Sequence, residues 1–199
     1  MRSEAIPSGL GCVVLAAGNA VRFGGGKLDA QVEGKTLLRR ALEAVPTECF
    51  AAVAVVVQSV QATALAQEFG FLAVRNPTPE RGVSSSLRLG LQALPPCGGV
   101  LFQVADQPYL TRETAAGLVR TFLDHPSRII CASHDGRRGN PCLFPARFFS
   151  ELLALEGDVG GGAVIKRHPE AVRLVEAPAR VLADVDSRDE LERLRHIGG

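Results

Sequence analysis

A glycine-rich loop that carries two cations follows directly after an apolar run near the start of the sequence. The segment VVLAAGNAVRFGGGK, residues 13–27, contains Arg22, Lys27 and the glycines Gly24 to Gly26. Glycine readily adopts positive φ, so such a loop can bring backbone N–H groups close to an anion while the cations add charge. A glycine cluster alone is more typical of a flexible turn. The preceding buried strand and the two cations favour a phosphate-binding loop.

Two common phosphate loops do not fit this sequence. A Walker A loop requires G-x-x-x-x-G-K-[ST], and Asp29 stands where the first glycine should precede Gly34-Lys35-Thr36. A Rossmann fingerprint follows a strand, whereas Gly9 and Gly11 precede it and Val14 occupies the next glycine position. An oxidoreductase with a nicotinamide or flavin cofactor, including one that acts on a small ring compound, is therefore disfavoured.

Carboxylates far along the chain could complete a metal–nucleotide site. Asp106 follows an apolar run, and Asp184 and Asp186 lie near the C-terminal end. Mg²⁺ in proteins is usually held by one or two carboxylates, several waters and substrate phosphate oxygens. Each carboxylate also has a structural interpretation: Asp106 could shape a turn or cap a helix, and Asp186 or Ser187 could cap the last helix with Glu190 completing a capping box. Capping and metal binding are compatible.

The elements that must position these residues alternate between apolar strands and amphipathic helices, which predicts an α/β fold: a single-domain, three-layer α/β/α, Rossmann-like architecture with a mostly parallel sheet. In such a sheet, ligands bind at the carboxyl ends of the strands. After Ser133 the rhythm loosens, so the short apolar segments 141–144 and 172–175 are expected to add antiparallel or edge strands. The predicted strands are 12–16, 51–57, 71–74, 100–104 and 129–132, and the predicted helices are 36–44, 61–69, 84–94 and 112–123.

Composition excludes several classes of protein. The chain has 199 residues, 46% hydrophobic content and a formal net charge of +1, which predicts one domain and gives no reason to expect a nucleic-acid or membrane partner. No long apolar segment is present at the N-terminus, so a cytoplasmic location is expected. Five cysteines without a C-x-x-C pair predict reduced thiols rather than disulfides or zinc ligands, and the four histidines show no ligand spacing.

Six motifs in the same order resemble the nucleotidyltransferases that include the molybdenum cofactor enzymes, the MobA-like NTP transferases. LAAGNAVRFGGGK is similar to L-A-A-G-x-x-x-R-[FM]-G-x-x-K. Asn76-Pro77 with RGVSSSLRLGL resembles a segment of the cytidylyltransferase branch, and VADQPYL resembles G-D-[QM]-P-x-[LV]. RGNPCLF, GDVGGGAVIKRH and DVDSRDEL are similar to three further family motifs. The resemblance covers residues 13–191.

The resemblance implies a role for each matching residue. The catalytic residues would be Arg22, Lys27 and Asp106, and the metal ligands would be Asp106 and Asp186, with Asp184 as the competitor of Asp186. The part at about 10–110 would bind the nucleotide, and the part at about 111–199 the acceptor. The implied nucleotide-binding residues are Leu15, Ala16, Ala17, Gly18, Arg22, Lys27, Asn76, Gly82 and Ser86, and the implied acceptor-binding residues are Gly139, Asn140, Pro141 and Asp158.

The resemblance also implies an activity: Mg²⁺- or Mn²⁺-dependent transfer of CMP from CTP to the phosphate of a molybdopterin-type acceptor, with transient contact to a molybdoenzyme or its chaperone. A guanylyltransferase that uses GTP and a non-catalytic nucleotide-binding or delivery module are the alternatives. Three positions depart from the family pattern, namely Ala105 for glycine, Asn140 for histidine and the missing arginine of G-D-x-G-A-R. Two of them lie on the acceptor side, where Arg137 and Arg138 could supply the charge instead.

Overall fold

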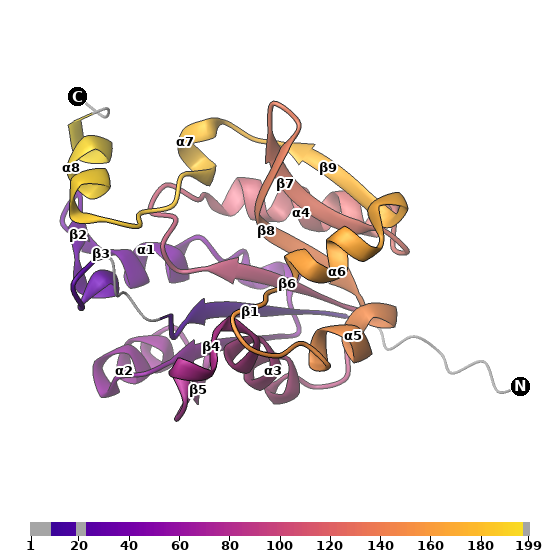
Figure 1. The fold of residues 1–199 in the computed structure, drawn as a ribbon, viewed down its shortest axis with the longest axis horizontal. Coiled ribbons are helices and arrows are strands. Elements are labelled where there is room, and N and C mark those ends of the chain that lie inside the picture. The colour runs from indigo at the N-terminus through magenta and orange to yellow at the C-terminus, as the bar shows by residue number, and fades with distance from the viewer. Residues whose placement is uncertain (1–8, 19–22, 197–199) are drawn as a thin grey trace, which may run out of the picture.

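The computed structural model describes residues 9–18 and 23–196 of the chain (Figure 1). Within these ranges, no helix combines the length and the apolar character needed to cross a membrane. The strands are β1 (Leu10–Ala16), β2 (Gln31–Val32), β3 (Lys35–Thr36), β4 (Ala52–Val57), β5 (Leu72–Arg75), β6 (Gly99–Val104), β7 (Ile129–His134), β8 (Arg137–Pro145) and β9 (Val172–Glu176). The α-helices are α1 (Leu37–Glu43), α2 (Val60–Glu68), α3 (Val83–Ala93), α4 (Arg112–Asp124), α5 (Phe149–Leu153), α6 (Gly162–Arg167), α7 (Ala179–Leu182) and α8 (Arg188–His196).

One seven-stranded sheet runs through the molecule in the order β5-β4-β1-β6-β8-β7-β9. Strand β8 pairs antiparallel with both β6 and β7, whereas β4, β1 and β6 pair in parallel, as do β7 and β9. The predicted strands and helices are confirmed, and the looser second half does contribute an antiparallel strand and an edge strand. The connection between β7 and β8 is short, because β7 extends to His134 and β8 begins at Arg137.

Helices cover both faces of the sheet and make the three layers visible in Figure 1. Helices α1, α2 and α4 pack on one face through residues such as Leu42, Ala66 and Leu118. Helices α3, α5 and α6 pack on the other face through residues such as Leu87 and Leu152. A strand covered on both faces must be apolar along its whole length, which explains the uninterrupted run of β4. The expected three-layer α/β/α fold is confirmed.

A small third hydrophobic cluster joins the two ends of the chain. Phe23, the residue directly before Gly24, is buried with Val32, Leu37, Val185 and Leu191. Because Phe23 and Val185 are far apart in the sequence, their burial together brings the loop next to the segment that carries Asp184 and Asp186. The cluster therefore fixes the geometry of the site without taking part in it.

The cysteines are free, as the sequence predicts. Cys12, Cys97, Cys131 and Cys142 are buried, and Cys49 is half-buried. Burial raises the pKa of the Cys12 thiol, because the thiolate would lose its hydration. These thiols are packing groups of the core.

Candidate functional site

Three residues that the sequence separates widely meet at the carboxyl ends of β1 and β6. The ammonium group of Lys27 donates a hydrogen bond to Asp106 Oδ2 at 2.7 Å and lies 3.4 Å from Asp186 Oδ1. The Lys27 side chain is only 12% exposed, whereas those of Asp106 and Asp186 are 28% and 42% exposed. The structure thus brings together a cation and the two carboxylates that were predicted to bind a metal.

Backbone hydrogen bonds hold the two carboxylates in place. The N–H of Val185 donates to the carbonyl oxygen of Asp106 at 2.9 Å, so the 184–186 segment is attached directly to the end of β6. Val185 is fully buried between two acidic residues that point elsewhere. The D-V-D alternation in the sequence is the signal for this arrangement. The sequence does not reveal that the backbone of Val185 pairs with that of Asp106.

A capping box fixes the start of α8 next to Asp186. The N–H of Glu190 donates to Ser187 Oγ at 3.2 Å, and the N–H groups of Asp186 and Ser187 donate to Glu190 Oε2 at 2.7 and 3.0 Å. Ser187 is therefore the N-cap, which decides between the two residues that the sequence left open. The carboxylate of Asp186 can face the site because Ser187 supplies the cap.

The glycine-rich loop leaves its backbone open to a ligand. Gly24, Gly25 and Gly26 have φ values of 80°, 90° and 62°, and a Cβ at any of them would find no atom within 4 Å. Only glycine adopts such conformations readily, and among the described residues no group fills the space where these side chains would lie. Gly18, at the other end of the loop, is also exposed. Arg22, the other cation predicted to act in catalysis, lies outside the described residues.

Negative charge is concentrated in the site beyond what Lys27 neutralises. Asp106 Oδ1 is buried and accepts no hydrogen bond from any described residue. The pKa of Asp184 is raised to about 6, first by partial burial of its carboxyl group and then by the negative charges of Asp106 and Asp186, although a hydrogen bond with Gln107 acts in the opposite direction. Neighbouring carboxylates, one of them with an oxygen that no described residue satisfies, are the donor set that a hard divalent cation prefers.

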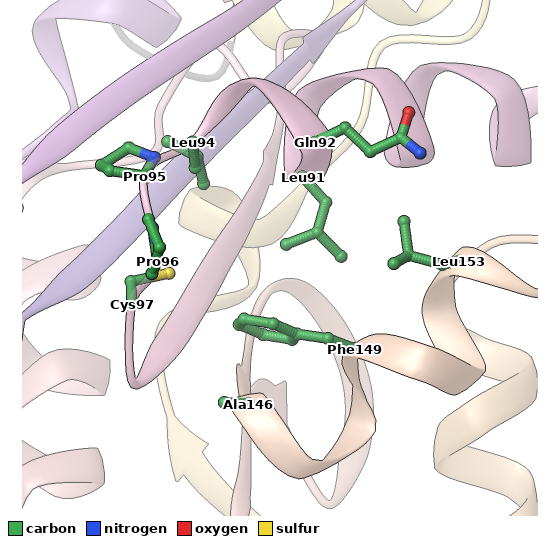
Figure 2. A pocket seen from close by; sticks show the side chains of 9 residues that line it. All are labelled: Leu91, Gln92, Leu94, Pro95, Pro96, Cys97, Ala146, Phe149 and Leu153. Atoms are coloured by element: carbon green, nitrogen blue, oxygen red, sulfur yellow. The ribbon is translucent and has the colours of Figure 1, made fainter. Parts of the chain in front are cut away.

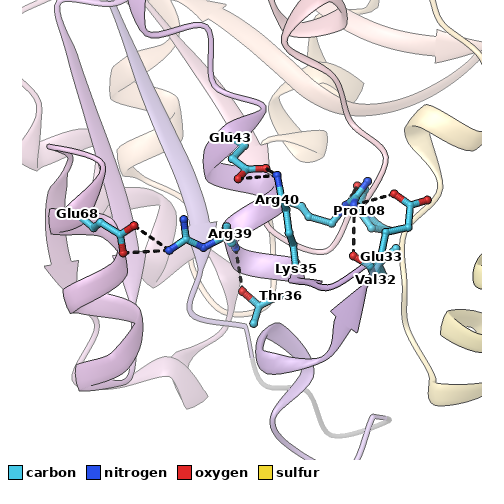
Figure 3. A network of polar contacts seen from close by, with 9 residues as sticks. All are labelled: Val32, Glu33, Lys35, Thr36, Arg39, Arg40, Glu43, Glu68 and Pro108. Atoms are coloured by element: carbon cyan, nitrogen blue, oxygen red, sulfur yellow. Dashed lines mark hydrogen bonds and ion pairs between the residues drawn. The ribbon is translucent and has the colours of Figure 1, made fainter.

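Arg40 in α1 connects the two loops that carry Lys27 and Asp106 (Figure 3). Its Nε donates to the carbonyl oxygen of Pro108 at 2.6 Å, and its Nη1 donates to Val32 O at 3.3 Å and to Glu33 Oε2 at 3.0 Å. The sequence analysis missed this residue, because one arginine on a polar helix face has no distinguishing motif. The neighbouring Arg39 points away from the site and pairs with Glu68 at 2.8 Å.

Asn76 acts on the start of α3 from inside the protein. It is 3% exposed, and its Nδ2 donates to Ser85 Oγ and Ser86 Oγ, both at 2.9 Å. Its Oδ1 accepts from the N–H of Thr78 at 2.9 Å. Asn76 therefore holds the first turn of α3, and Ser86 is buried beside it.

Gly82, the residue before α3, lies directly against the loop that the sequence assigns to the acceptor. It has φ 87° and ψ 177°, and a Cβ there would lie 2.4 Å from the carbonyl carbon of Gly157 and 2.5 Å from the nitrogen of Asp158. The carboxylate of Asp158 accepts from the N–H of Val83 at 3.3 Å. Gly82 and the 157–158 segment, far apart in sequence, form one continuous wall.

A cavity of about 320 Å³ opens beside this wall. Leu15 at the end of β1 and Val104 at the end of β6 form its floor, and Arg138, Gly139 and Asn140 of β8 contribute its polar groups. Pro141, which the resemblance also assigns to the acceptor, is buried in β8. The remaining lining residues are Val83, Leu87, Phe102, Cys142, Phe144, Gly160, Gly161, Gly162 and Ile165. The cavity is thus mostly apolar, with one guanidinium group at its edge.

Cys142 in the cavity wall is a buried thiol paired with Cys131. Its pKa is raised by its hydrogen bond to Cys131, the residue directly opposite in β7, and by burial. A thiol with a raised pKa stays protonated near neutral pH, and the thiolate is the reactive form.

A second cavity, whose lining side chains are drawn in Figure 2, lies beside the segment that precedes β6, at the end of that strand opposite to Asp106. It has a volume of about 400 Å³ and lies between the end of α3, the 94–97 segment before β6, and α5. Its lining residues are Leu91, Gln92, Leu94, Pro95, Pro96, Cys97, Ala146, Phe149 and Leu153. None of these residues was predicted to function, and none is charged.

Solved structures with the same fold cover nearly the whole chain. A homologue of Mycobacterium tuberculosis Rv0371c from Mycobacterium sp. strain JC1 is 27% identical, with a TM-score of 0.79, over 94% of this chain and 96% of its own. Rv0371c from Mycobacterium tuberculosis in complex with manganese is 24% identical, with a TM-score of 0.74, over 95% of this chain and 99% of its own. Molybdopterin-guanine dinucleotide biosynthesis protein A from Archaeoglobus fulgidus is 17% identical, with a TM-score of 0.65, over 94% and 97%.

Sequence comparison identifies the family. No protein in the curated set matches the chain significantly. The family profile described as the MobA-like NTP transferase domain matches residues 12–172, which includes the glycine-rich loop, Asp106 and the cavity-lining part of β8. The chain belongs to the MobA-like NTP transferase family and is a nucleotidyltransferase.

Proposed function

We propose that this nucleotidyltransferase transfers CMP from CTP to the phosphate of a molybdopterin-type acceptor, with a divalent cation, Mg²⁺ or Mn²⁺, in the site. The observation that carries the proposal is the meeting of Lys27, Asp106 and Asp186 next to a cavity whose floor is formed by the same two strand ends. A nucleotide in the glycine-rich loop and an acceptor in the cavity would both reach these charges. A cytoplasmic location and contact with a molybdoenzyme are further predictions.

In this reaction an oxygen of the acceptor phosphate attacks the α-phosphorus of CTP, the bond to the bridging oxygen of the β-phosphate breaks, and pyrophosphate leaves. The acceptor phosphate is already an anion, so no general base is required. The metal, when held by Asp106 and Asp186, supplies charge that offsets the negative charge developing on the phosphates. Lys27 and the glycine-rich backbone of residues 24–26 would bind and orient the triphosphate, so positioning and charge stabilisation would provide most of the rate.

The acceptor chemistry follows from the cavity. Its apolar walls suit a flat ring system, and the backbone of Gly160 to Gly162 allows the ring to approach closely. The Arg138 guanidinium at the edge is a planar donor that suits a phosphate. This cation would take the place of the arginine that the GDVGGGA segment lacks. Gly139 and Asn140 supply additional polar contacts, while Pro141 and Asp158 shape the wall.

The choice of CTP depends on the turn before α3. Gly82 to Ser86 resembles the cytidylyltransferase branch of the family, and Asn76 fixes this turn by two hydrogen bonds. A guanylyltransferase is the second candidate, because the neighbour from Archaeoglobus fulgidus is named for the guanine dinucleotide form of the cofactor. A non-catalytic delivery module is the third.

Turnover with each nucleotide tests the proposal. Pyrophosphate release should require CTP, a divalent cation and a molybdopterin-type acceptor, and CTP at about 100 times its Kd should stabilise the fold by roughly 2.7 kcal/mol. Thermal unfolding with CTP, GTP, ATP and UTP measures the binding preference independently of the acceptor. Turnover with GTP alone would support the guanylyl alternative, and nucleotide binding without turnover would support the delivery module.

Replacing Arg40 with alanine should lower turnover about tenfold, because the Asp106 loop loses its anchor at Pro108 and the catalytic geometry is disturbed. Arg39→Ala is the matched control, since it removes an arginine from the adjacent position in α1 and breaks an ion pair that does not reach the site. The measurement is kcat, together with the metal concentration that gives half-maximal activity. If both variants lose the same activity and need the same metal concentration, Arg40 does not position the loop.

A further inference from the structure

The ammonium group of Lys27 occupies the space between the carboxylates that would hold the metal. Its Nζ is 2.7 Å from Asp106 Oδ2 and 3.4 Å from Asp186 Oδ1, and the side chain is 12% exposed. The same lysine is expected to bind the triphosphate. In this position two of the contacts of its ammonium group are with protein carboxylates, so its charge is directed at them and not at a ligand.

A divalent cation fits the same carboxylates, and one oxygen is available for it. Asp106 Oδ1 is buried and receives no hydrogen bond from the described residues, which is a costly state for a carboxylate oxygen. A cation that contacted Asp106 and Asp186 would lie very close to the ammonium group of Lys27. Two positive charges at that distance in a partly buried site repel each other strongly, so one of them has to leave.

We propose that Lys27 is an internal counter-ion that competes with the divalent cation for Asp106 and Asp186. Free metal is then bound poorly by the protein alone. When the triphosphate enters, it offers Lys27 other anionic partners, and the carboxylates become available to the metal. The nucleotide and the metal therefore bind cooperatively. This inference rests on the proposed function for the triphosphate step, but the competition itself concerns only residues of this chain.

The surroundings of Lys27 permit this change of partner. The preceding residues Gly24 to Gly26 adopt positive φ and have open space where side chains would be. The Lys27 backbone is anchored through its carbonyl oxygen, which accepts from the N–H of Ala30 at 3.2 Å. A fixed backbone with a long side chain next to an open loop allows Nζ to move from the carboxylates to a bound phosphate.

The test is Mn²⁺ binding by the protein without nucleotide, measured by electron paramagnetic resonance of the free ion. Lys27→Met should bind Mn²⁺ at least tenfold more tightly than the wild type, and Lys27→Gln should do the same. Lys27→Arg, which keeps the charge, should bind as weakly as the wild type. Lys35→Met is the matched control, because the Lys35–Glu43 ion pair at 2.8 Å is exposed and lies outside the site. Its Mn²⁺ affinity should equal that of the wild type.

The double variant Lys27→Met/Asp106→Asn locates the ion, since the gain in affinity should disappear. Equal or weaker Mn²⁺ binding by both neutral Lys27 variants, with circular dichroism like that of the wild type, would overturn the proposal. So would a gain that persists without the Asp106 carboxylate. A protein that turns over no nucleotide would refute the proposed function. The comparison of Mn²⁺ affinities would still test the competition, because it is made without nucleotide and without acceptor.

Discussion

Replacing Asp106 with asparagine is expected to lower turnover by roughly 10³-fold or more, the range seen when a single charge-stabilising group is removed from a preorganised site. Asparagine keeps the size of the side chain but removes the negative charge that faces Lys27 and the metal position. The variant should fold, because two effects offset each other. The ion pair with Lys27 at 2.7 Å is lost, but the repulsion between Asp106 and Asp184 is relieved. Its free energy of unfolding should change by no more than about 1 kcal/mol.

The measurement combines pyrophosphate release at saturating CTP and metal with urea unfolding of the same samples. Asp124→Asn is the control, because Asp124 is an exposed residue at the end of α4, shortly before β7 begins and away from the carboxyl ends of the strands. It should retain full activity. An Asp106→Asn variant with more than a tenth of the wild-type kcat would show that this carboxylate does not hold the catalytic cation.

Replacing Gly82 with alanine should destabilise the protein by roughly 2–4 kcal/mol, since backbone strain and overpacking each cost about 1–3 kcal/mol. The backbone at φ 87° and ψ 177° belongs to a region that is almost exclusive to glycine. The added Cβ would also meet the backbone of Gly157 and Asp158 at 2.4 to 2.5 Å, and backbone atoms cannot rotate away. The turn before α3 and the acceptor loop would be pushed apart, so CTP affinity should fall as well.

Gly34→Ala separates the two causes. Gly34 also has positive φ, at 76°, but a Cβ there would find no atom within 4 Å, so only the strain of about 1 kcal/mol is expected. Urea unfolding of both variants gives the difference in free energy, and titration with CTP gives the change in affinity. Equal losses of stability in the two variants would mean that the contact between Gly82 and residues 157–158 is absent in solution.

Much of the fold could be predicted from local pattern. Runs such as 51–57 are too apolar for a half-exposed strand, and their alternation with helices indicates a covered parallel sheet, which the structure confirms. The antiparallel position of β8 could only be suspected, because a short apolar segment does not reveal its pairing partner. Asn76 illustrates the same limit. The resemblance implies only that it binds the nucleotide, whereas the structure shows a buried side chain that donates hydrogen bonds to two serines.

The sequence by itself determined the family, and it predicted a phosphate-binding glycine-rich loop and the carboxylates that accompany it, because these depend on residue type and spacing along the chain. Only the tertiary structure decided which charges meet. The contact of Lys27 with Asp106 and Asp186, the attachment of Val185 to the end of β6, and the packing of Gly82 on Gly157 join segments that are 75 or more residues apart. Burial of the small cluster around Phe23 and the pairing at the strand ends bring them together, and no local pattern encodes such distances.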